Sequence, residues 1–519
     1  MSEDLLVQIY NAFDPKRPLE PDSPFYVDCH AVRGQENIIK EVGRSIVLAN
    51  EPIYQLYTGH RGVGKSTELR RLRRYLEQND RKVIYFEATD DIDEIDVQYT
   101  DILLSCTRHL LEDLWHYADP KPLVNWLRSG WEYSTDLASA KIDFSGLRQA
   151  EQISMFTKLT ALLRQAPSIR QKIRDQLDLQ MESLIKTLNY FIVEAQQSSG
   201  KELVLIIDNL DRIGLVSYGN DKTNHDRIFL DHSMELGQLA CNVIYTVPIS
   251  LVYSNRASQL RAIYGNCSVL PMVMVRSPNG TIHQPGLDKM KQLVQQRVGQ
   301  FTDKALVPEV FESNAVLESL CLASGGHMRE LMQLVQTALN WTEQLPIQRQ
   351  AMLRAVAKGR DDYRNAVDEV DWERLAAVAQ TKRIPNEDDY RGLLFNRCVL
   401  EYRMMEETED DFRAVLWHDV HPLIQKLEPF QRAVERLQKS NVPPPIYRFS
   451  LSGSSSDEDV QNKLAIMQEN NPDWKFVPDK PKPGESKAFL AIHKDVDERI
   501  YQGVYIIERT LTEIFDQLL

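Results

Sequence analysis

The chain has 519 residues, of which 61 are Lys or Arg and 75 are Asp or Glu, so its formal net charge is −14. With 43% hydrophobic and 26% charged residues, the composition is that of a folded protein, and the length suits about three or four domains. Because phosphate repels an acidic chain, the charge argues against a protein that mainly coats nucleic acid or an anionic membrane.

The cysteines and the N-terminal residues bear on location. Six cysteines are scattered without a C-x-x-C pair, which is typical of a reducing compartment and of packing roles. Residues 1–29 are predicted to be an extended leader and no signal peptide, because prolines recur at 15, 18, 21 and 24. The uncharged stretch 236–255 predicts a buried strand rather than a membrane span, since Asn242 and Pro248 interrupt it. We therefore expect a cytoplasmic protein with no membrane partner.

A strand, a glycine-rich loop, a helix and a second strand follow one another near the N-terminus. The apolar runs 53–58 and 82–87 predict the strands, and a charged segment over about 68–79 predicts the helix between them. This βαβ order implies a parallel sheet. Two later apolar runs, 203–207 and 242–247, are typical of strands buried on both faces. We therefore predict an α/β fold whose sheet is interrupted by a helical insert over about 97–200.

The loop between the first strand and the helix matches G-x-x-x-x-G-K-[ST], and its nine residues are Gly59, His60, Arg61, Gly62, Val63, Gly64, Lys65, Ser66 and Thr67. Glycines let successive backbone N–H groups point at phosphate oxygens, and the start of the following helix adds positive potential. In this pattern Lys65 contacts the β- and γ-phosphates and the Ser66 hydroxyl binds Mg²⁺. The sequence thus predicts a P-loop with ATP and Mg²⁺ as cofactors.

The strand 203–207 ends at Asp208, which predicts a carboxylate on the Mg²⁺ side of the nucleotide. Many ATPases place a second carboxylate directly after it to polarise the attacking water, but this chain has Asn209 there and Asp211 two residues later. An amide cannot take a proton. Either Asp211 serves instead, or it is a helix-start carboxylate and hydrolysis is slow.

Further segments resemble the AAA+ ATPases and their signalling relatives, the STAND ATPases, most nearly the replication-initiator-like branch. The segment at Val32 and Arg33 resembles the entry segment that borders the adenine in these families. The segment 324–331, which contains Arg329, resembles the sensor-2 part of the lid, where an arginine senses the γ-phosphate. Thr246 at the end of the strand 242–247 resembles the sensor-1 position.

This resemblance implies an ATP hydrolase and a homo-oligomer, in which Arg256 or Arg261 would be the trans-acting arginine finger. It also implies an order of parts along the chain. We predict a leader at 1–29, a P-loop core at 30–283, a helical lid at 284–364, a winged-helix-like module at 365–428 and a small α/β module at 429–519.

Two functions follow from the resemblance. The first is an ATP-driven switch in prokaryotic signalling or antiviral defence that assembles and binds a protein partner or effector through its C-terminal modules. The alternative is an initiator-like or transposition-type ATPase that acts on DNA through the winged helix. The predicted recognition helix over 386–392 begins with polar and acidic residues, and the predicted wing carries five more acids at 406, 407 and 409–411. Phosphate would repel these acids, which disfavours DNA. A scaffold that binds nucleotide without turnover is a third reading.

Three other polar groups are predicted to be structural. His418 and His421 are three residues apart but lack further metal ligands, so we expect them to pack. The polar group at 225, 226 and 231 and the basic helix 70–74 are predicted to be solvated faces.

Overall fold

In the computed structural model the chain forms two compact units, Met1–Phe430 and Gln431–Leu519. The residues that the structure describes are 2–16, 18–131, 149–165, 167–218, 222–385, 388–407, 412–440, 446–451, 457–470, 474–479, 487–493 and 507–509. The nucleotide-binding motif lies in the first unit, which is therefore described in more detail.

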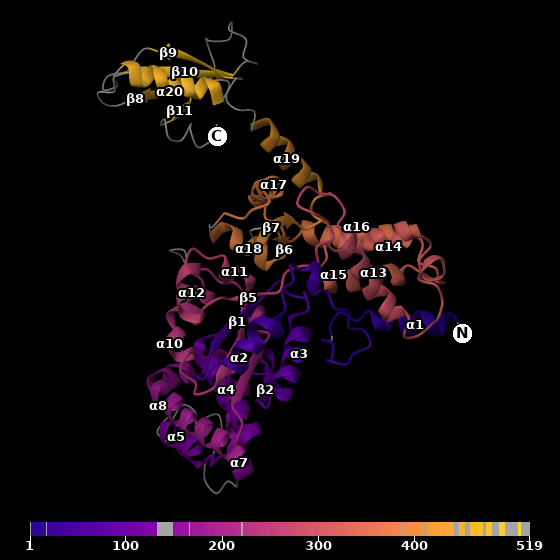
Figure 1. Cartoon of the computed structure of the whole chain (residues 1–519). Helices are drawn as coiled ribbons and strands as arrows, with labels where there is room; N and C mark the ends of the chain where they lie inside the picture. Colours follow the sequence, from indigo (N-terminus) through magenta and orange to yellow (C-terminus); the bar gives the residue numbers. More distant parts are fainter. Residues whose placement is uncertain are drawn as a thin grey trace. The chain divides into compact units, whose positions relative to one another are not determined.

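The first unit is built around a five-stranded parallel sheet (Figure 1). In the order β2-β3-β4-β1-β5 the strands are Lys82–Glu87, Leu203–Asp208, Asn242–Thr246, Tyr54–Thr58 and Ser268–Val269. Every residue of β3 and β4 is buried, which confirms the two apolar runs as doubly covered strands. The short fifth strand was not predicted, because two residues are too few for a periodic pattern. Since all strands are parallel, their carboxyl ends lie at one edge of the sheet.

Helices cover both faces of this sheet. On one face α3 (Lys65–Gln78) packs through a buried stripe of Leu69, Leu72 and Leu76 against β2 and β3, as the i, i+3, i+7 spacing predicts. The shorter helical segments of the core are His30–Val32, Ile39–Gly43, α2 (Arg44–Leu48), Ala88–Asp90, Leu210–Arg212, α9 (Asn224–Asp226), Arg227–Asp231, α10 (Ser233–Leu236), α11 (Ile249–Val252) and α12 (Ala257–Tyr264).

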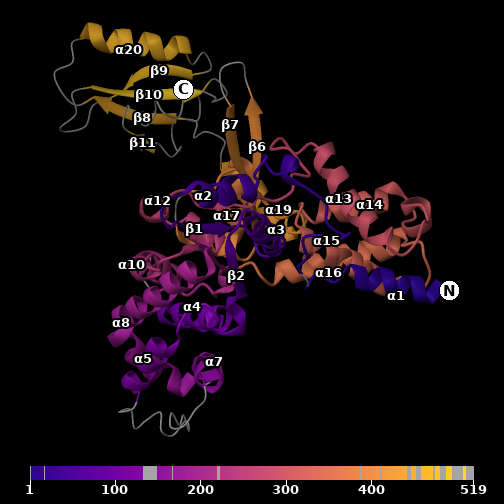
Figure 2. The same ribbon diagram turned by 60° about the horizontal axis from the view of Figure 1, so that its bottom comes forward.

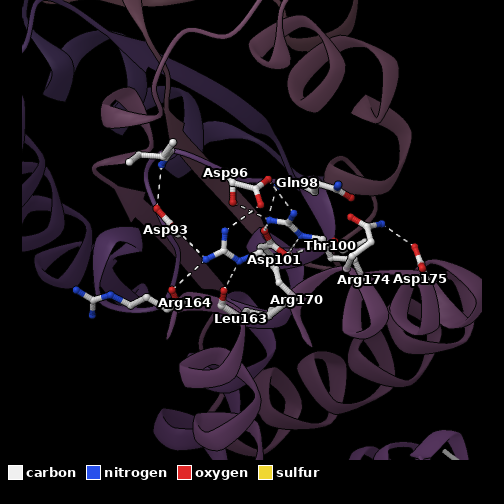
Figure 3. Close-up of polar contacts among 12 residues, drawn as sticks. Asp93, Asp96, Gln98, Thr100, Asp101, Leu163, Arg164, Arg170, Arg174 and Asp175 are labelled. Atoms are coloured by element: carbon white, nitrogen blue, oxygen red, sulfur yellow. Dashed lines mark hydrogen bonds and ion pairs between the residues drawn. The ribbon is translucent and has the colours of Figure 1, made fainter. Parts of the chain in front are cut away.

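The predicted insert is helical in the described residues and consists of α4 (Tyr99–Leu114), α5 (Lys121–Trp131), α7 (Gln149–Gln165) and α8 (Pro167–Ser199). These helices lie together, away from the later helices α13–α16 (Figures 1 and 2). Two buried arginines of α8 attach the insert to the segment after β2 (Figure 3). Arg170 bonds Asp93 at 2.7 Å and Asp96 at 2.9 Å, and Arg174 donates to Asp101 at 3.0 Å. The insert is thus fastened to the chain that leaves the second strand.

After the sheet the chain forms a group of helices, α13 (Gln284–Val298), Leu306–Val310, α14 (Asn314–Ala323), α15 (Met328–Asn340) and α16 (Arg349–Arg364). Then follow α17 (Asp371–Thr381), Asp388–Tyr390, α18 (Arg391–Phe395) and an antiparallel hairpin of β6 (Val399–Glu407) and β7 (Phe412–Val420). The base of the hairpin is part of the core, because the Tyr402 hydroxyl donates to the Gly325 carbonyl at 2.7 Å and Arg403 pairs with Glu36 at 2.7 Å. Three acids of the predicted wing, at 409–411, lie outside the described residues.

The N-terminal segment corrects one prediction. Residues 2–12 are not extended but form α1 (Ser2–Ala12), which contacts α13 and α15. Ile9 and Phe13 are fully buried there, and the Gln336 amide donates to the Tyr10 carbonyl at 3.1 Å. The prolines begin only at residue 15, so they do not forbid a helix before it, and the apolar i, i+4 spacing stabilises one against the lid.

One of the two predicted solvated faces is also corrected. His225 and Asp226 are fully buried rather than solvated, and their burial depends on residues distant in the chain. The basic helix is solvated at Arg73 and Arg74, whose side chains are 45% and 46% exposed. Arg74 also pairs with Asp22 of the N-terminal segment.

The second unit contains a four-stranded sheet in the order β11-β8-β10-β9, where the strands are Ile507–Arg509, Ile446–Leu451, Lys487–His493 and Trp474–Asp479. The helices α19 (Glu428–Ser440), which begins in the first unit, and α20 (Asp457–Asn470) complete the described elements. The apolar spacing near the C-terminus predicts a helix over 505–518; of these residues only 507–509 are described, and they form β11 instead. Among the helices that the structure describes, none is long and apolar enough to cross a membrane.

Candidate nucleotide site

The loop between β1 and α3 has the backbone that the glycine pattern predicts. Gly59, Gly62 and Gly64 have φ angles of 147°, 85° and 111°, a region in which side chains are strained. A Cβ on Gly62 would lie 2.7 Å from the Arg329 Cβ, and one on Gly59 would lie 2.5 Å from the Leu270 carbonyl oxygen. The glycines therefore serve both the turn and the close approach of the lid.

Lys65 is the first residue of α3, and its side chain is buried. Its Nζ donates to the carbonyls of Gly59 at 2.7 Å and His60 at 3.0 Å and lies 2.9 Å from Asp211 Oδ2. Asp211 thus neutralises the lysine that the motif assigns to phosphate. A phosphate group that binds Lys65 would have to replace this carboxylate.

Asp208 ends β3 and is fully buried beneath Tyr85, whose hydroxyl donates to it at 2.6 Å. The Ser66 hydroxyl also hydrogen-bonds to it. Burial, and secondly the negative charge of Asp211, raises the pKa of Asp208, so a nearby cation would stabilise its ionised form. A carboxylate beside a hydroxyl is a donor set that Mg²⁺ accepts. Ser66 and Asp208 therefore fit the predicted metal role.

Asn209 has a left-handed backbone, with φ at 68°, which asparagine tolerates better than most residues. This turn directs its side chain to the neighbouring strand, where Nδ2 donates to Glu87 Oε2 at 2.7 Å. Sequence reasoning missed Glu87. The available signal was its place at the carboxyl end of a predicted strand, the same place that identified Asp208.

Arginines gather at the phosphate end of the pocket, where Arg61, Arg212 and Arg329 line it together with Lys65. Burial lowers the pKa of Arg329, and the charges of neighbouring arginines, Arg212 first, lower it further. Burial likewise lowers the pKa of Arg61. Crowded, partly buried guanidinium groups are stabilised by an anion, so this end of the pocket favours a polyphosphate.

The rest of the pocket lining comes from three parts of the chain: the N-terminal segment, β5 with its following residues, and the helices α13 and α15. It mixes apolar side chains, among them Val27, Leu270, Leu293 and Met332, with charged ones, such as Arg297. A cleft with apolar side chains beside a cationic group is complementary to a nucleotide, whose base is apolar on its faces and whose phosphates are anionic.

The structure brings some predicted site residues to this pocket and not others. Arg33 lines it and donates to the Val63 carbonyl at 2.8 Å, whereas neighbouring Val32 instead bonds Met274 through its backbone. Thr246 is fully buried, and its hydroxyl is engaged with backbone groups of Ile207 and Leu210.

The two arginine-finger candidates lie outside the pocket lining. Arg256 pairs with Asp231 at 2.8 Å, and Arg261 is an exposed residue of α12. The two histidines considered for metal binding pack instead: His418 bonds the Tyr253 hydroxyl at 3.0 Å, and His421 stacks on Tyr363. Within the part of the chain that the structure describes, no group of three metal-ligating side chains occurs.

Neither a protein-family model nor a curated protein matches this chain. Its fold is similar to that of Cdc6p from Pyrobaculum aerophilum, at 11% identity and a TM-score of 0.33 over 82% of this chain and 98% of that one. A Walker-type ATPase of Pyrococcus abyssi is similar at 13% identity and a TM-score of 0.36, over 80% of this chain and 100% of that one. The Aeropyrum pernix ORC2 protein is similar at 12% identity and a TM-score of 0.36, over 88% and 98%. Because these TM-scores are low, the assignment of function rests on the geometry of the site.

Proposed function

We propose that the chain is a Mg²⁺-dependent ATPase of the AAA+ type that works as a nucleotide-driven switch. One observation carries this proposal. A glycine loop, its lysine and serine, and an arginine of α15 converge on one pocket that also has apolar side chains, and a buried carboxylate lies beside the serine hydroxyl. This arrangement suits ATP better than an unphosphorylated ligand, since the cationic end would be left without an anion.

Some residues of the site would bind the nucleotide, and others would couple its binding to movement of the lid. Lys65 would leave Asp211 for the β- and γ-phosphates, and the N–H groups of the loop would bind the remaining oxygens. Mg²⁺, held by Ser66 and Asp208, would neutralise charge on the same phosphates. The Arg329 backbone N–H donates to the Gly62 carbonyl at 3.2 Å, so a phosphate that moves the loop also moves the lid.

Replacing Lys65 by alanine is expected to weaken ATP binding about 100-fold, because a charge-assisted hydrogen bond to phosphate is worth up to about 3 kcal/mol. Calorimetric titration with ATP and Mg²⁺ measures this change. Since the single variant leaves Asp211 buried without its partner, the double variant Lys65→Ala with Asp211→Asn is measured beside it. Arg73→Ala is the control, because it removes a positive charge from the solvent side of α3, where Arg73 pairs with Glu77. Unchanged affinity in both Lys65 variants would sink the proposal.

The biological role we propose is a switch in prokaryotic signalling or antiviral defence, which assembles with ATP and binds a protein effector through residues 365–519. The resemblance to STAND ATPases supports this role. The alternative is an initiator-like ATPase that reads DNA through a winged helix at 365–428. Against that alternative, α18 has only five residues, and its Arg391 is buried against the core rather than presented to a groove.

Particle size and DNA binding distinguish these two roles. Light scattering is expected to detect a larger particle with ATP than without it, and Lys65→Ala is expected to remove the difference. A salt-sensitive complex with duplex DNA at about 0.1 M salt, with no change in particle size, would instead favour the alternative.

A further inference from the structure

We infer that Glu87, at the end of the second strand, is the catalytic base that activates the attacking water, and that Asn209 positions it. This inference rests on the proposed ATPase function and gives that function the carboxylate that position 209 lacks. Glu87 lies 122 positions before Asn209, the asparagine that hydrogen-bonds to it.

The register of the sheet places Glu87 at the site. Strands β2 and β3 pair in parallel with Glu87 opposite Asp208, so both carboxylates stand at the carboxyl edge of the sheet. Glu87 lines the same pocket as Lys65, Ser66 and Asn209. Tyr85, two residues earlier and so on the same face of the strand, bonds Asp208. The face of β2 that contacts Asp208 through Tyr85 therefore also carries Glu87.

The contacts of Glu87 suit a base. Oε2 accepts a hydrogen bond from the Asn209 amide at 2.7 Å, which orients the carboxylate. Oε1 lies 3.5 Å from an Arg70 nitrogen, too far for a short bond that would occupy it. The side chain is 31% exposed, so water reaches it, unlike the fully buried Asp208.

Asp211, the other carboxylate considered for this role, has a different partner. It lies 2.9 Å from the Lys65 ammonium, and the side chains of both residues are almost fully buried. The Lys65 ammonium occupies Asp211 Oδ2 in this buried pair, whereas the Glu87 side chain is partly exposed to water. Asp211 therefore pairs with the P-loop lysine before phosphate binds, and Glu87 activates the water.

The step balances without another reactant. The water oxygen forms a bond to the γ-phosphorus while the bond from that phosphorus to the bridging oxygen breaks. The electron pair of the broken bond stays on the bridging oxygen of ADP, and inorganic phosphate is released. The proton of the water passes to the Glu87 carboxylate.

The test compares ATP binding and steady-state phosphate release in the full-length protein. Glu87→Gln is expected to lower kcat by about 10²- to 10⁴-fold, while the dissociation constant for ATP changes by less than about threefold. Glu20→Gln is the matched control, because Glu20 is the other carboxylate on Arg70 but does not line the nucleotide pocket. Asp211→Asn is expected to retain most of kcat and to bind ATP more tightly, since Lys65 loses its competing partner.

Asn209 is tested by a measurement that a merely structural role would not affect. Asn209→Ala removes the hydrogen bond that orients Glu87, so kcat is expected to fall at least tenfold while the dissociation constant for ATP changes by less than about threefold. The exchange variant Glu87→Asn with Asn209→Glu keeps an amide and a carboxylate in contact. Its kcat is expected to be at least tenfold higher than that of Glu87→Gln.

The failures are distinguishable. If Glu87→Gln releases phosphate at the rate of the wild type, or if Asp211→Asn alone shows the large loss, the assignment of Glu87 is overturned and the ATPase stands. If the wild type binds ATP but releases no phosphate, the hydrolytic function itself is overturned, and the assignment falls with it.

Discussion

Replacing Arg391 by methionine is expected to destabilise the first unit by roughly 3–5 kcal/mol, because it leaves a buried carboxylate without its cation. Arg391 is 1% exposed and Asp226 is fully buried, and their side chains meet at 2.8 Å. The same guanidinium donates to the Ser250 carbonyl at 3.1 Å and to the Thr223 hydroxyl at 3.1 Å. One side chain thus joins α18 to two segments of the core, the one at 223–226 and the one at Ser250.

Chemical denaturation followed by tryptophan fluorescence measures this change. Arg413→Met is the matched control, since its pair with Glu406 in the hairpin is largely exposed and is worth at most about 1 kcal/mol. Adding Asp226→Asn to Arg391→Met is expected to recover part of the loss by removing the uncompensated charge. A loss below about 1 kcal/mol for Arg391→Met would contradict this view of the pair.

Acid is expected to destabilise the contact between the P-loop and the hairpin through His60. Its Nε2 accepts a hydrogen bond from the Glu401 N–H at 3.0 Å, which requires the neutral ring. Burial first, and then the charge of Lys65, lowers the pKa of His60 to about 3. Because the unfolded chain binds a proton near pH 6.5 and the folded chain does not, stability rises with pH between about 3 and 6.5. The contribution is complete above this window and falls as the pH falls through it.

From pH 7.5 to pH 4.5 this one histidine is expected to remove about 2.7 kcal/mol from the free energy of unfolding. Other buried groups also titrate over this range, so the quantity to measure is the difference between the wild type and His60→Asn. The variant is expected to lose about 2.7 kcal/mol less than the wild type over the same interval. Equal losses in the two proteins would contradict the prediction.

The backbone of the glycine loop and the buried strand that ends at Asp208 could be predicted because their signals are local. The glycine pattern sets the backbone of residues 59–64, and a continuous apolar run specifies a buried strand together with the residue, Asp208, that ends it. The helical insert followed from its periodicity for the same reason. The predicted extended leader is wrong over 2–12, because the prolines at 15–24 follow this segment and do not prevent its apolar spacing from forming a helix.

Contacts between segments far apart in the chain were decided only by the tertiary structure. The hydrogen bond from Asn209 to Glu87 depends on which strand lies beside β3, and the pair of Arg391 with Asp226 joins residues 165 positions apart. Propensity and spacing describe the chain over one or two turns, whereas strand order and the burial of charge depend on packing across the whole unit. The sequence alone thus predicts phosphate binding at residues 59–67, whereas packing brings Glu87 beside Asn209, the contact on which the proposed role of Glu87 rests.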